Sequence, residues 1–168
     1  GVGSAAIQIA RQLGARVLST GSTPAKRELA ERLGAEQVFD PAETTWPAAV
    51  RRATGGRGVD VVVEHVGGSV LQQVFQCLGR GGSVVTCGAT AGREVTLNLW
   101  PLFVKQQRLI GSYSRNRADL LATLDWAAAG KLQPVIESVY PLADAPQALQ
   151  RLRERAVLGK LVVNPLTH

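Results

Sequence analysis

Apolar and polar positions along the chain follow two spacings, one typical of helices and the other of strands. Over the first ninety residues the two spacings alternate regularly, which indicates helices and strands in strict succession. Helices are predicted at residues 5–13, 24–33, 46–53 and 69–78. Strands are predicted at residues 15–20, 37–39, 59–63 and 83–87.

Local signals punctuate these elements. Thr23 can cap the second helix and Pro24 suits its first turn, while Gly34 can supply a left-handed end. A glycine-rich turn is expected at 79–82, before the strand that starts at Ser83. The helices and strands are therefore expected to begin and end close to these residues.

Beyond Thr90 the alternation becomes less regular. The pattern predicts a short helix at 97–105 broken at Pro101, a strand at 108–114, and a helix at 116–129 capped by Asn116. A strand at 135–142, a helix at 145–155 and a strand at 160–163 follow. We interpret this last part as a segment that leaves the sheet.

Strands that are apolar on consecutive positions require cover on both faces, and a helix between each pair of strands favours parallel crossovers. The predicted fold class is α/β, with a doubly wound parallel sheet. Residues 1–130 are expected to form the main domain, and residues 131–168 a C-terminal strand-helix-strand segment. Because no strand precedes the glycine turn at Gly1, the sheet is expected to lack its first strand and to follow further chain upstream.

Composition narrows the class of protein. The 168 residues are 45% hydrophobic and 19% charged, and no apolar run approaches the roughly 18 residues of a membrane span. We therefore expect a globular cytoplasmic protein. The net charge is +6, but the arginines are scattered without interleaved aromatic residues, so a basic surface that attracts a polyanionic ligand is favoured over nucleic-acid binding.

Glycines at the start of a helix can carry chemistry. Gly1 and Gly3 fit the end of a turn whose backbone approaches a diphosphate, with the unpaired helix amides facing its charge. An ordinary turn is the alternative. The helix, strand and helix that follow favour dinucleotide binding.

The end of the next strand bears on which dinucleotide would bind. An acid there would favour NAD, but the sequence offers hydroxyls and, one turn into the helix, Lys26 with Arg27 beside it. Ser22 and Lys26 together suit the 2′-phosphate of NADP. The alternative is a capped helix with exposed basic residues.

Three kinds of reactive or bulky side chain have simpler interpretations. His65 could relay a proton, but the favoured interpretation is a structural histidine held by a hydrogen bond. Cys77 and Cys87 have no paired spacing and no clustered histidines, so both are expected to be free thiols, with Cys87 a small buried packing residue. Trp46, Trp100 and Trp126 are expected in the core or at an interface, and Trp100 could border a substrate cleft.

An ordered series of motifs resembles the cofactor domain of the medium-chain dehydrogenase/reductase family, which includes zinc-type alcohol dehydrogenases and quinone oxidoreductases. The matching motifs span nearly the whole chain: residues 1–10, Leu33-Gly34-Ala35, residues 54–62, Gly81-Gly82, Gly88 and residues 159–163. The resemblance implies a Rossmann-like fold whose C-terminal segment returns to a catalytic domain upstream. In the family that upstream half carries the catalytic zinc ligands, so no catalytic or metal-binding residue is expected in this chain.

The resemblance also implies roles for particular residues. It assigns Gly1, Val2 and Gly3 to the diphosphate turn, Ser22 and Lys26 to the adenosine ribose or 2′-phosphate, and Val66 to packing on the adenosine. It further assigns Gly88, Ala89, Thr90 and Ser112 to backbone contacts with the nicotinamide, and Lys160 to the phosphates. The counterpart of strand 108–114 often forms a homodimer contact.

These expectations converge on an oxidoreductase that transfers hydride between NADP(H), favoured over NAD(H), and an alcohol or aldehyde, with zinc held by the upstream half. A zinc-free quinone or enoyl reductase is the alternative. A nucleotide-binding sensor module without catalysis, and an RNA-binding role, are further hypotheses. The chain alone is expected to show no dehydrogenase turnover.

Overall fold

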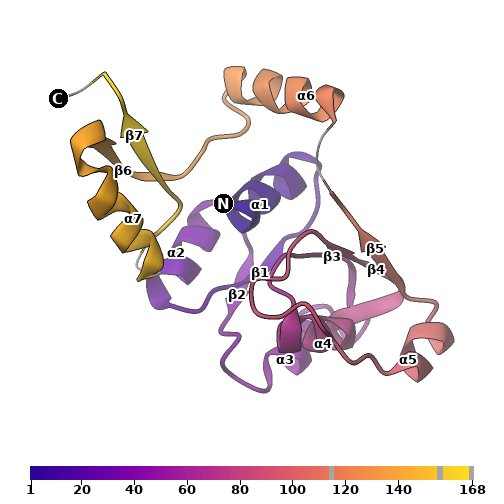
Figure 1. The fold of residues 1–168 in the computed structure, drawn as a ribbon. Coiled ribbons are helices and arrows are strands. Elements are labelled where there is room, and N and C mark those ends of the chain that lie inside the picture. The colour runs from indigo at the N-terminus through magenta and orange to yellow at the C-terminus, as the bar shows by residue number, and fades with distance from the viewer. Residues whose placement is uncertain (114–115, 155–156, 167–168) are drawn as a thin grey trace.

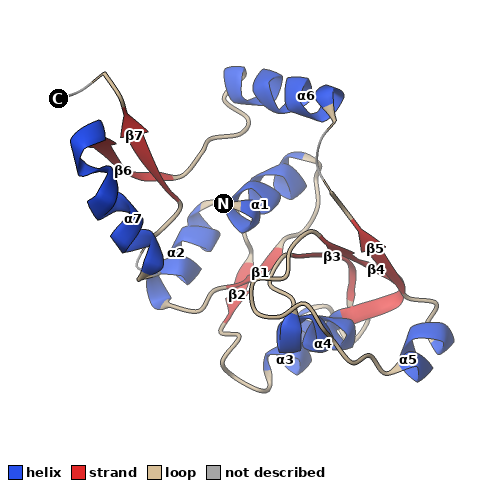
Figure 2. Ribbon diagram, viewed as in Figure 1, coloured by secondary structure: helices blue, strands red, loops and turns tan. Residues whose placement is uncertain are grey.

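The computed structural model describes residues 1–113, 116–154 and 157–166. Within these residues the strands form three parallel sheets (Figures 1 and 2). The first joins β1 (Leu18–Thr20) to β2 (Gln37–Phe39), and the second has the order β3 (Val59–Glu64), β4 (Leu78–Thr86) and β5 (Arg108–Gly111). The third joins β6 (Ile136–Pro141) to β7 (Lys160–Asn164).

Helices connect the strands as the spacing predicts. They are α1 (Val2–Gln12), α2 (Pro24–Arg32), α3 (Trp46–Ala53), α4 (Gly68–Cys77), α5 (Leu99–Val104), α6 (Arg117–Ala128) and α7 (Ala145–Arg153), with a short 3-10 turn over Leu142–Asp144. The Thr23 hydroxyl caps α2 by accepting a hydrogen bond from the Lys26 amide at 3.3 Å. The Asn116 side chain caps α6 by accepting from the Ala118 amide at 2.8 Å. Both caps satisfy amides that the helix itself leaves unpaired, as predicted.

Helices alternate with parallel strands and lie on both sides of β1 and β2, which confirms the predicted α/β class. On one side α3 and α4 pack beneath the strands (Figure 1), where Trp46, Val50, Leu71, Val74, Cys77, Leu78 and Val84 form the larger core. On the other side Ile7 of α1, Ala30 of α2 and Ala35 form a smaller cluster. Leu18 and Phe39 pack against the larger core and Val38 packs against the smaller cluster, so β1 and β2 lie between two layers of helices.

Two local predictions are wrong. The expected turn at 79–82 lies inside β4, because Val59 pairs with Leu78 while Val61 already pairs with Ser83, so the intervening glycines form an irregularity within the strand. Pro101 does not break α5, because it occupies the third position of the helix, where the missing amide has no intrahelical acceptor to lose.

The cover of β3 is also less complete than expected. Val61 and Val63 are 58% and 49% exposed, whereas Val62 on the other face packs against the larger core. Among the described residues β3 pairs only with β4, and β1 pairs only with β2. Helix α6 contributes no buried residue, so it does not supply the missing cover.

The C-terminal segment has its own small framework. Arg151 of α7 donates one hydrogen bond to the Tyr140 hydroxyl at 2.9 Å and another to Glu137 of β6, which also accepts from the Leu158 amide. The segment is linked to α1 through the Gln8 side chain, which exchanges two hydrogen bonds with the backbone of Gln133, at 3.0 and 2.9 Å. These two bonds place the chain just before β6 beside α1.

Candidate functional site

Most of the predicted site residues lie just beyond the carboxyl ends of parallel strands. Ser22 follows β1, Val66 follows β3, residues 88–90 follow β4, and Ser112 follows β5. Parallel strands bring these ends to the same edge of each sheet. In open α/β sheets this edge is where ligands bind.

The first turn of α1 lies at this edge. The Nε2 atom of His65, which follows β3, is 3.5 Å from the position that a β-carbon on Gly3 would take. The Nζ atom of Lys160, at the start of β7, is 3.5 Å from the corresponding position on Gly1. Gly1 and Val2 are exposed, and the first turn of α1 contains no acidic residue. Unpaired amides, the helix dipole and a lysine therefore favour an anion here.

The loop after β3 is held by a buried carboxylate. Glu64 is 3% exposed, and it accepts hydrogen bonds from the amides of Val66 at 2.6 Å and Gly67 at 2.8 Å, and from the Thr86 hydroxyl at 3.3 Å. All three donors lie at the carboxyl edge of the sheet. Glu64 therefore has a structural role, and it fixes the backbone that carries His65 and Val66.

The loop after β4 packs closely against the loop after β3. A β-carbon on Gly88 would lie 2.6 Å from the carbonyl oxygen of His65, so a larger residue would push the two loops apart. The Ala91 amide donates to the Val66 carbonyl at 2.7 Å, and Gly67 and Gly92 form an isolated parallel bridge. Ala89 and Thr90 are exposed beside this contact. The two loops form one wall of the edge.

The turn between β1 and α2 carries the polar side chains expected for an adenosine ribose or phosphate. The Lys26 ammonium lies 3.4 Å from the Ser22 hydroxyl, which is exposed. Arg27, however, is not a free cation: it donates to the Gly21 carbonyl and to the Asp40 carboxylate, both at 2.8 Å. Sequence reasoning missed this pair, because Asp40 follows a different strand.

Ser112 lies at the end of β5, one residue beyond the strand, which is shorter than predicted. Its amide donates to the Thr86 carbonyl at 2.8 Å, so the register of β4 and β5 fixes its position. The predicted strand extended to Ser114, which lies outside the described residues. The roles assigned to Ser112 and to the other site residues remain predictions.

One reactive side chain differs from its expected environment. Cys87 is exposed rather than buried, because it lies beyond the end of β4, and its amide donates to the Glu64 carbonyl at 3.0 Å. Of the tryptophans, Trp46 is 4% exposed in the larger core, whereas Trp100 is 69% exposed on α5.

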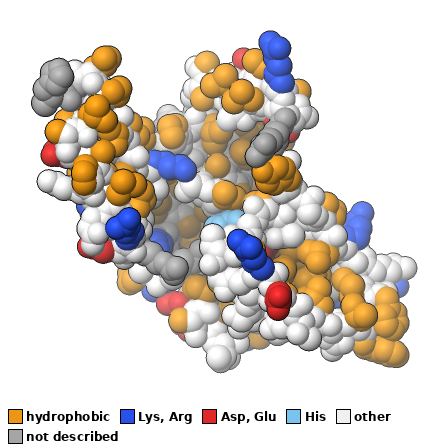
Figure 3. All heavy atoms as spheres, in the orientation of Figure 1, with side chains coloured by type: hydrophobic (Ala, Val, Ile, Leu, Met, Phe, Trp, Pro, Cys, Tyr) orange, Lys and Arg blue, Asp and Glu red, His pale blue; other side chains and the backbone are white. Residues whose placement is uncertain are grey.

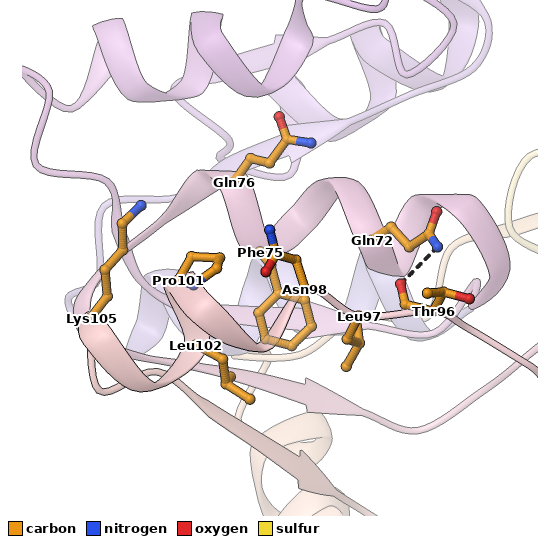
Figure 4. Close-up of a pocket in the computed structure, with 9 residues that line it drawn as sticks. All are labelled: Gln72, Phe75, Gln76, Thr96, Leu97, Asn98, Pro101, Leu102 and Lys105. Carbon is orange, nitrogen blue, oxygen red and sulfur yellow. Dashed lines mark hydrogen bonds between the residues drawn. The ribbon is translucent and has the colours of Figure 1, made fainter.

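A pocket of about 500 Å³ lies away from this edge, between α4, residues 96–98 and α5 (Figure 4). Phe75, Leu97, Pro101 and Leu102 supply its apolar lining, and none of the predicted site residues contributes to it. Inside the three described ranges, no group of three His, Cys, Asp or Glu side chains could hold a metal ion. No helix in those ranges is long and apolar enough to cross a membrane.

The basic side chains on the face shown in Figure 3 form separate groups rather than one continuous strip. Several arginines are paired with acids: Arg16 with Glu36, Arg27 with Asp40, Arg32 with Glu28, Arg57 with Asp60, and Arg151 with Glu137. Such pairing reduces the positive field that a nucleic-acid backbone would need.

Comparisons with known proteins agree on one family. Residues 1–129 match the sequence model of the family described as zinc-binding dehydrogenase. The chain is 30% identical to the 2-haloacrylate reductase of a Burkholderia species, over 98% of this chain and 53% of that protein. It is 34% identical to the phthioceranic/hydroxyphthioceranic acid synthase of Mycobacterium tuberculosis, over 98% of this chain and 8% of the synthase.

Solved structures give the same picture. The crystal structure of an NAD-dependent alcohol dehydrogenase superimposes with a TM-score of 0.91 at 38% identity, covering 98% of this chain and 48% of that one. The crystal structure of a 2-haloacrylate reductase superimposes with a TM-score of 0.85 at 29% identity, covering 99% of this chain and 55% of that one. The chain spans about half the length of these two proteins and a small part of the synthase.

Proposed function

From the premise that this chain belongs to the zinc-binding dehydrogenase family, we propose that it is the cofactor-binding part of an oxidoreductase that uses a nicotinamide dinucleotide. One observation carries the proposal: the first turn of α1, His65, the Gly88 loop and Lys160 meet at the carboxyl edge of parallel strands. A dinucleotide diphosphate has the charge and size that such an edge accepts.

We assign each part of the dinucleotide to a different group of residues. The amides of Val2 and Gly3, together with the Lys160 ammonium, would hold the diphosphate. Ser22 and Lys26 would hold the adenosine ribose or its 2′-phosphate, with Val66 beside the adenosine. The backbone of residues 88–90 and of Ser112 would hold the nicotinamide. The cofactor supplies the hydride, and these groups orient it and neutralise its charge.

We propose NADP(H) as the preferred cofactor, because the Lys26 ammonium and Ser22 hydroxyl are adjacent and no acid follows β1 directly. We further propose an alcohol or aldehyde as the substrate, with zinc held by a separate segment of the whole protein. The similarity to a 2-haloacrylate reductase supports an alternative, the zinc-free reduction of an activated carbon–carbon double bond.

Titration calorimetry of the protein with NADPH and NADH tests the cofactor proposal. Lys160→Ala is expected to weaken both cofactors by a similar factor, because both contain the diphosphate. Lys26→Ala is expected to weaken NADPH about tenfold and NADH less than twofold, since only NADPH carries the 2′-phosphate. If neither dinucleotide binds the unmodified protein, the cofactor proposal is wrong; equal effects of Lys26→Ala on both would refute the NADP(H) preference.

The reaction class is tested separately in the whole protein. Zinc-dependent reduction of NADP⁺ with an alcohol panel is expected under the leading proposal. Oxidation of NADPH with 2-chloroacrylate that persists after chelation would favour the alternative. A sensor module would bind the dinucleotide and turn over neither substrate.

We also propose a homodimer through β5. This strand pairs with β4 along one edge only within the described residues, and its Leu109 and Ile110 are each 44% exposed. Apolar side chains gather beside it on α5, at the lower right of Figure 3, where Leu99, Trp100 and Phe103 are all exposed. An unpaired apolar edge strand is a common site of pairing between chains. Ile110→Lys should convert the dimer to a monomer in sedimentation analysis, and a monomeric unmodified protein would refute the proposal.

A further inference from the structure

The turn after β1 lies beside an acid that the linear sequence hides. Thr20 at the end of β1 is paired with Phe39 at the end of β2, so the residues that follow, Gly21 and Asp40, lie side by side at the same edge. The Gly21 amide donates to the Phe39 carbonyl at 2.9 Å and continues this pairing by one step. Asp40 therefore brings a carboxylate beside the turn that follows β1, although the residues of that turn include no acid.

Arg27 covers that carboxylate. Its guanidinium donates to Asp40 Oδ2 and to the Gly21 carbonyl, both at 2.8 Å, and the side chains of Arg27 and Asp40 are only 26% and 25% exposed. The stem of Arg27 also fills the space beside Gly21, because a β-carbon there would lie 2.8 Å from its Cγ. The arginine thus occupies the position of a side chain at residue 21 and neutralises the acid behind it.

The charges at this turn leave one net positive charge. Lys26 and Arg27 each carry one positive charge and Asp40 carries one negative charge, and the Lys26 ammonium is 3.4 Å from the exposed Ser22 hydroxyl. Because Arg27 and Asp40 neutralise each other, Lys26 supplies the net positive charge at this turn. Without Arg27, the Asp40 carboxylate would cancel the charge of Lys26. A free carboxylate would repel a 2′-phosphate, and a free guanidinium would attract it.

We propose that Arg27 is a specificity-determining residue: it neutralises Asp40, so that no negative charge opposes a 2′-phosphate beside Ser22 and Lys26, and the preference for NADPH over NADH is preserved. The proposal rests on the proposed dinucleotide site. Neither residue needs to touch the cofactor, because the pair acts through the field at the turn. Removing either partner changes that field by one charge, in opposite directions.

The test uses three variants and both cofactors. Arg27→Met keeps the apolar stem beside Gly21 but removes the charge. Asp40→Asn keeps the side-chain oxygen that accepts from the Ala42 amide at 2.9 Å. The double variant restores the original net charge without the pair. For each protein, calorimetry at low salt measures the ratio of the dissociation constants for NADH and NADPH.

Arg27→Met is expected to lower this ratio about threefold and Asp40→Asn to raise it about threefold, since single charges near a solvated ligand act weakly. The double variant is expected to return the ratio to that of the unmodified protein. At 1 M salt, where screening acts within about 3 Å, all three ratios should converge. A change in folding alone would weaken both cofactors together and would not reverse its sign between the two variants.

Asp60→Asn is the matched control. Asp60 also pairs with an arginine, Arg57, but it lies near the start of β3, at the opposite edge of the sheet, so the ratio should not change. If both single variants move the ratio in the same direction, or neither moves it while binding persists, the proposal is overturned and the dinucleotide site stands. If the unmodified protein binds neither cofactor, the dinucleotide site itself fails.

Discussion

Replacing Glu64 should loosen the carboxyl edge of β3. The carboxylate is 3% exposed and accepts hydrogen bonds from two amides, Val66 at 2.6 Å and Gly67 at 2.8 Å, and from the Thr86 hydroxyl at 3.3 Å. Alanine would remove the acceptor and leave the buried Gly67 amide without a partner. Glutamine would keep one oxygen acceptor while losing the charge.

The magnitude follows from these contacts. A hydrogen bond to a charged group contributes about 1.5–3 kcal/mol to stability, and the two amide bonds are the short ones. Glu64→Ala is therefore expected to cost about 3–5 kcal/mol of unfolding free energy, a large part of the roughly 5–15 kcal/mol typical of a domain. Glu64→Gln is expected to cost about 1–2 kcal/mol, because the amides keep an acceptor.

Urea unfolding followed by circular dichroism measures both changes. Asp60→Asn is the control on the same strand, because its carboxylate is an exposed surface partner of Arg57, and it should change stability by less than about 0.5 kcal/mol. Loss of under about 1 kcal/mol in Glu64→Ala would refute the reasoning, since it would mean that the loop after β3 does not depend on the carboxylate.

Three further predictions test the packing and the titrating groups. Gly88→Ala should destabilise the protein by about 1–3 kcal/mol, because the new β-carbon would lie 2.6 Å from the His65 carbonyl oxygen. Gly111→Ala is the control and should leave stability unchanged, because its β-carbon would meet no atom within 4 Å. Equal melting temperatures for the two variants would contradict this prediction. At pH 8, a thiol reagent should react quickly with the exposed Cys87 and slowly with Cys77 in the folded protein, because burial raises the pKa of the Cys77 thiol to about 12. Rapid reaction of both thiols would contradict the structure. The Leu158 amide and then Arg151 lower the pKa of Glu137 below its ordinary 4.5, so its contribution to stability is present above pH 4.5 and is lost as pH falls through the lower folded-state value. Hydrogen-exchange protection factors in β6 and β7, which are corrected for the intrinsic pH dependence of exchange, should therefore fall on acidification, and Glu137→Gln should remove that fall.

Much of the fold could be predicted because its signals are local. The bounds of β2 and α3 are those expected from the spacing of apolar residues, and Thr23 and Asn116 cap their helices as predicted. The errors arise where a partner strand intervenes. The glycines at 79–82 are typical of a turn when the sequence is considered alone. They belong to β4 because the residues on either side of them, Leu78 and Ser83, pair with Val59 and Val61 of β3.

The candidate site shows the same division. The glycines at the start of α1, and the Ser22 and Lys26 pair, can be recognised from spacing and residue type alone. The approach of His65 to Gly3, and the exposure of Cys87, could not be inferred, because both depend on how segments distant in the sequence pack at the edge of a sheet. A lone histidine or cysteine carries no local signal of its surroundings.

The amino-acid sequence by itself determined the succession of helices and strands, the α/β class and the residue types offered to a dinucleotide. Periodicity, caps and turn residues act over a few positions, so they can be read without knowing which strand pairs with which. The tertiary structure alone decided that Asp40 lies under Arg27, that Lys160 lies beside Gly1, and that Val61 and Val63 remain exposed. Each of these depends on strand order and packing between distant segments, where charge and shape meet only after the chain has folded.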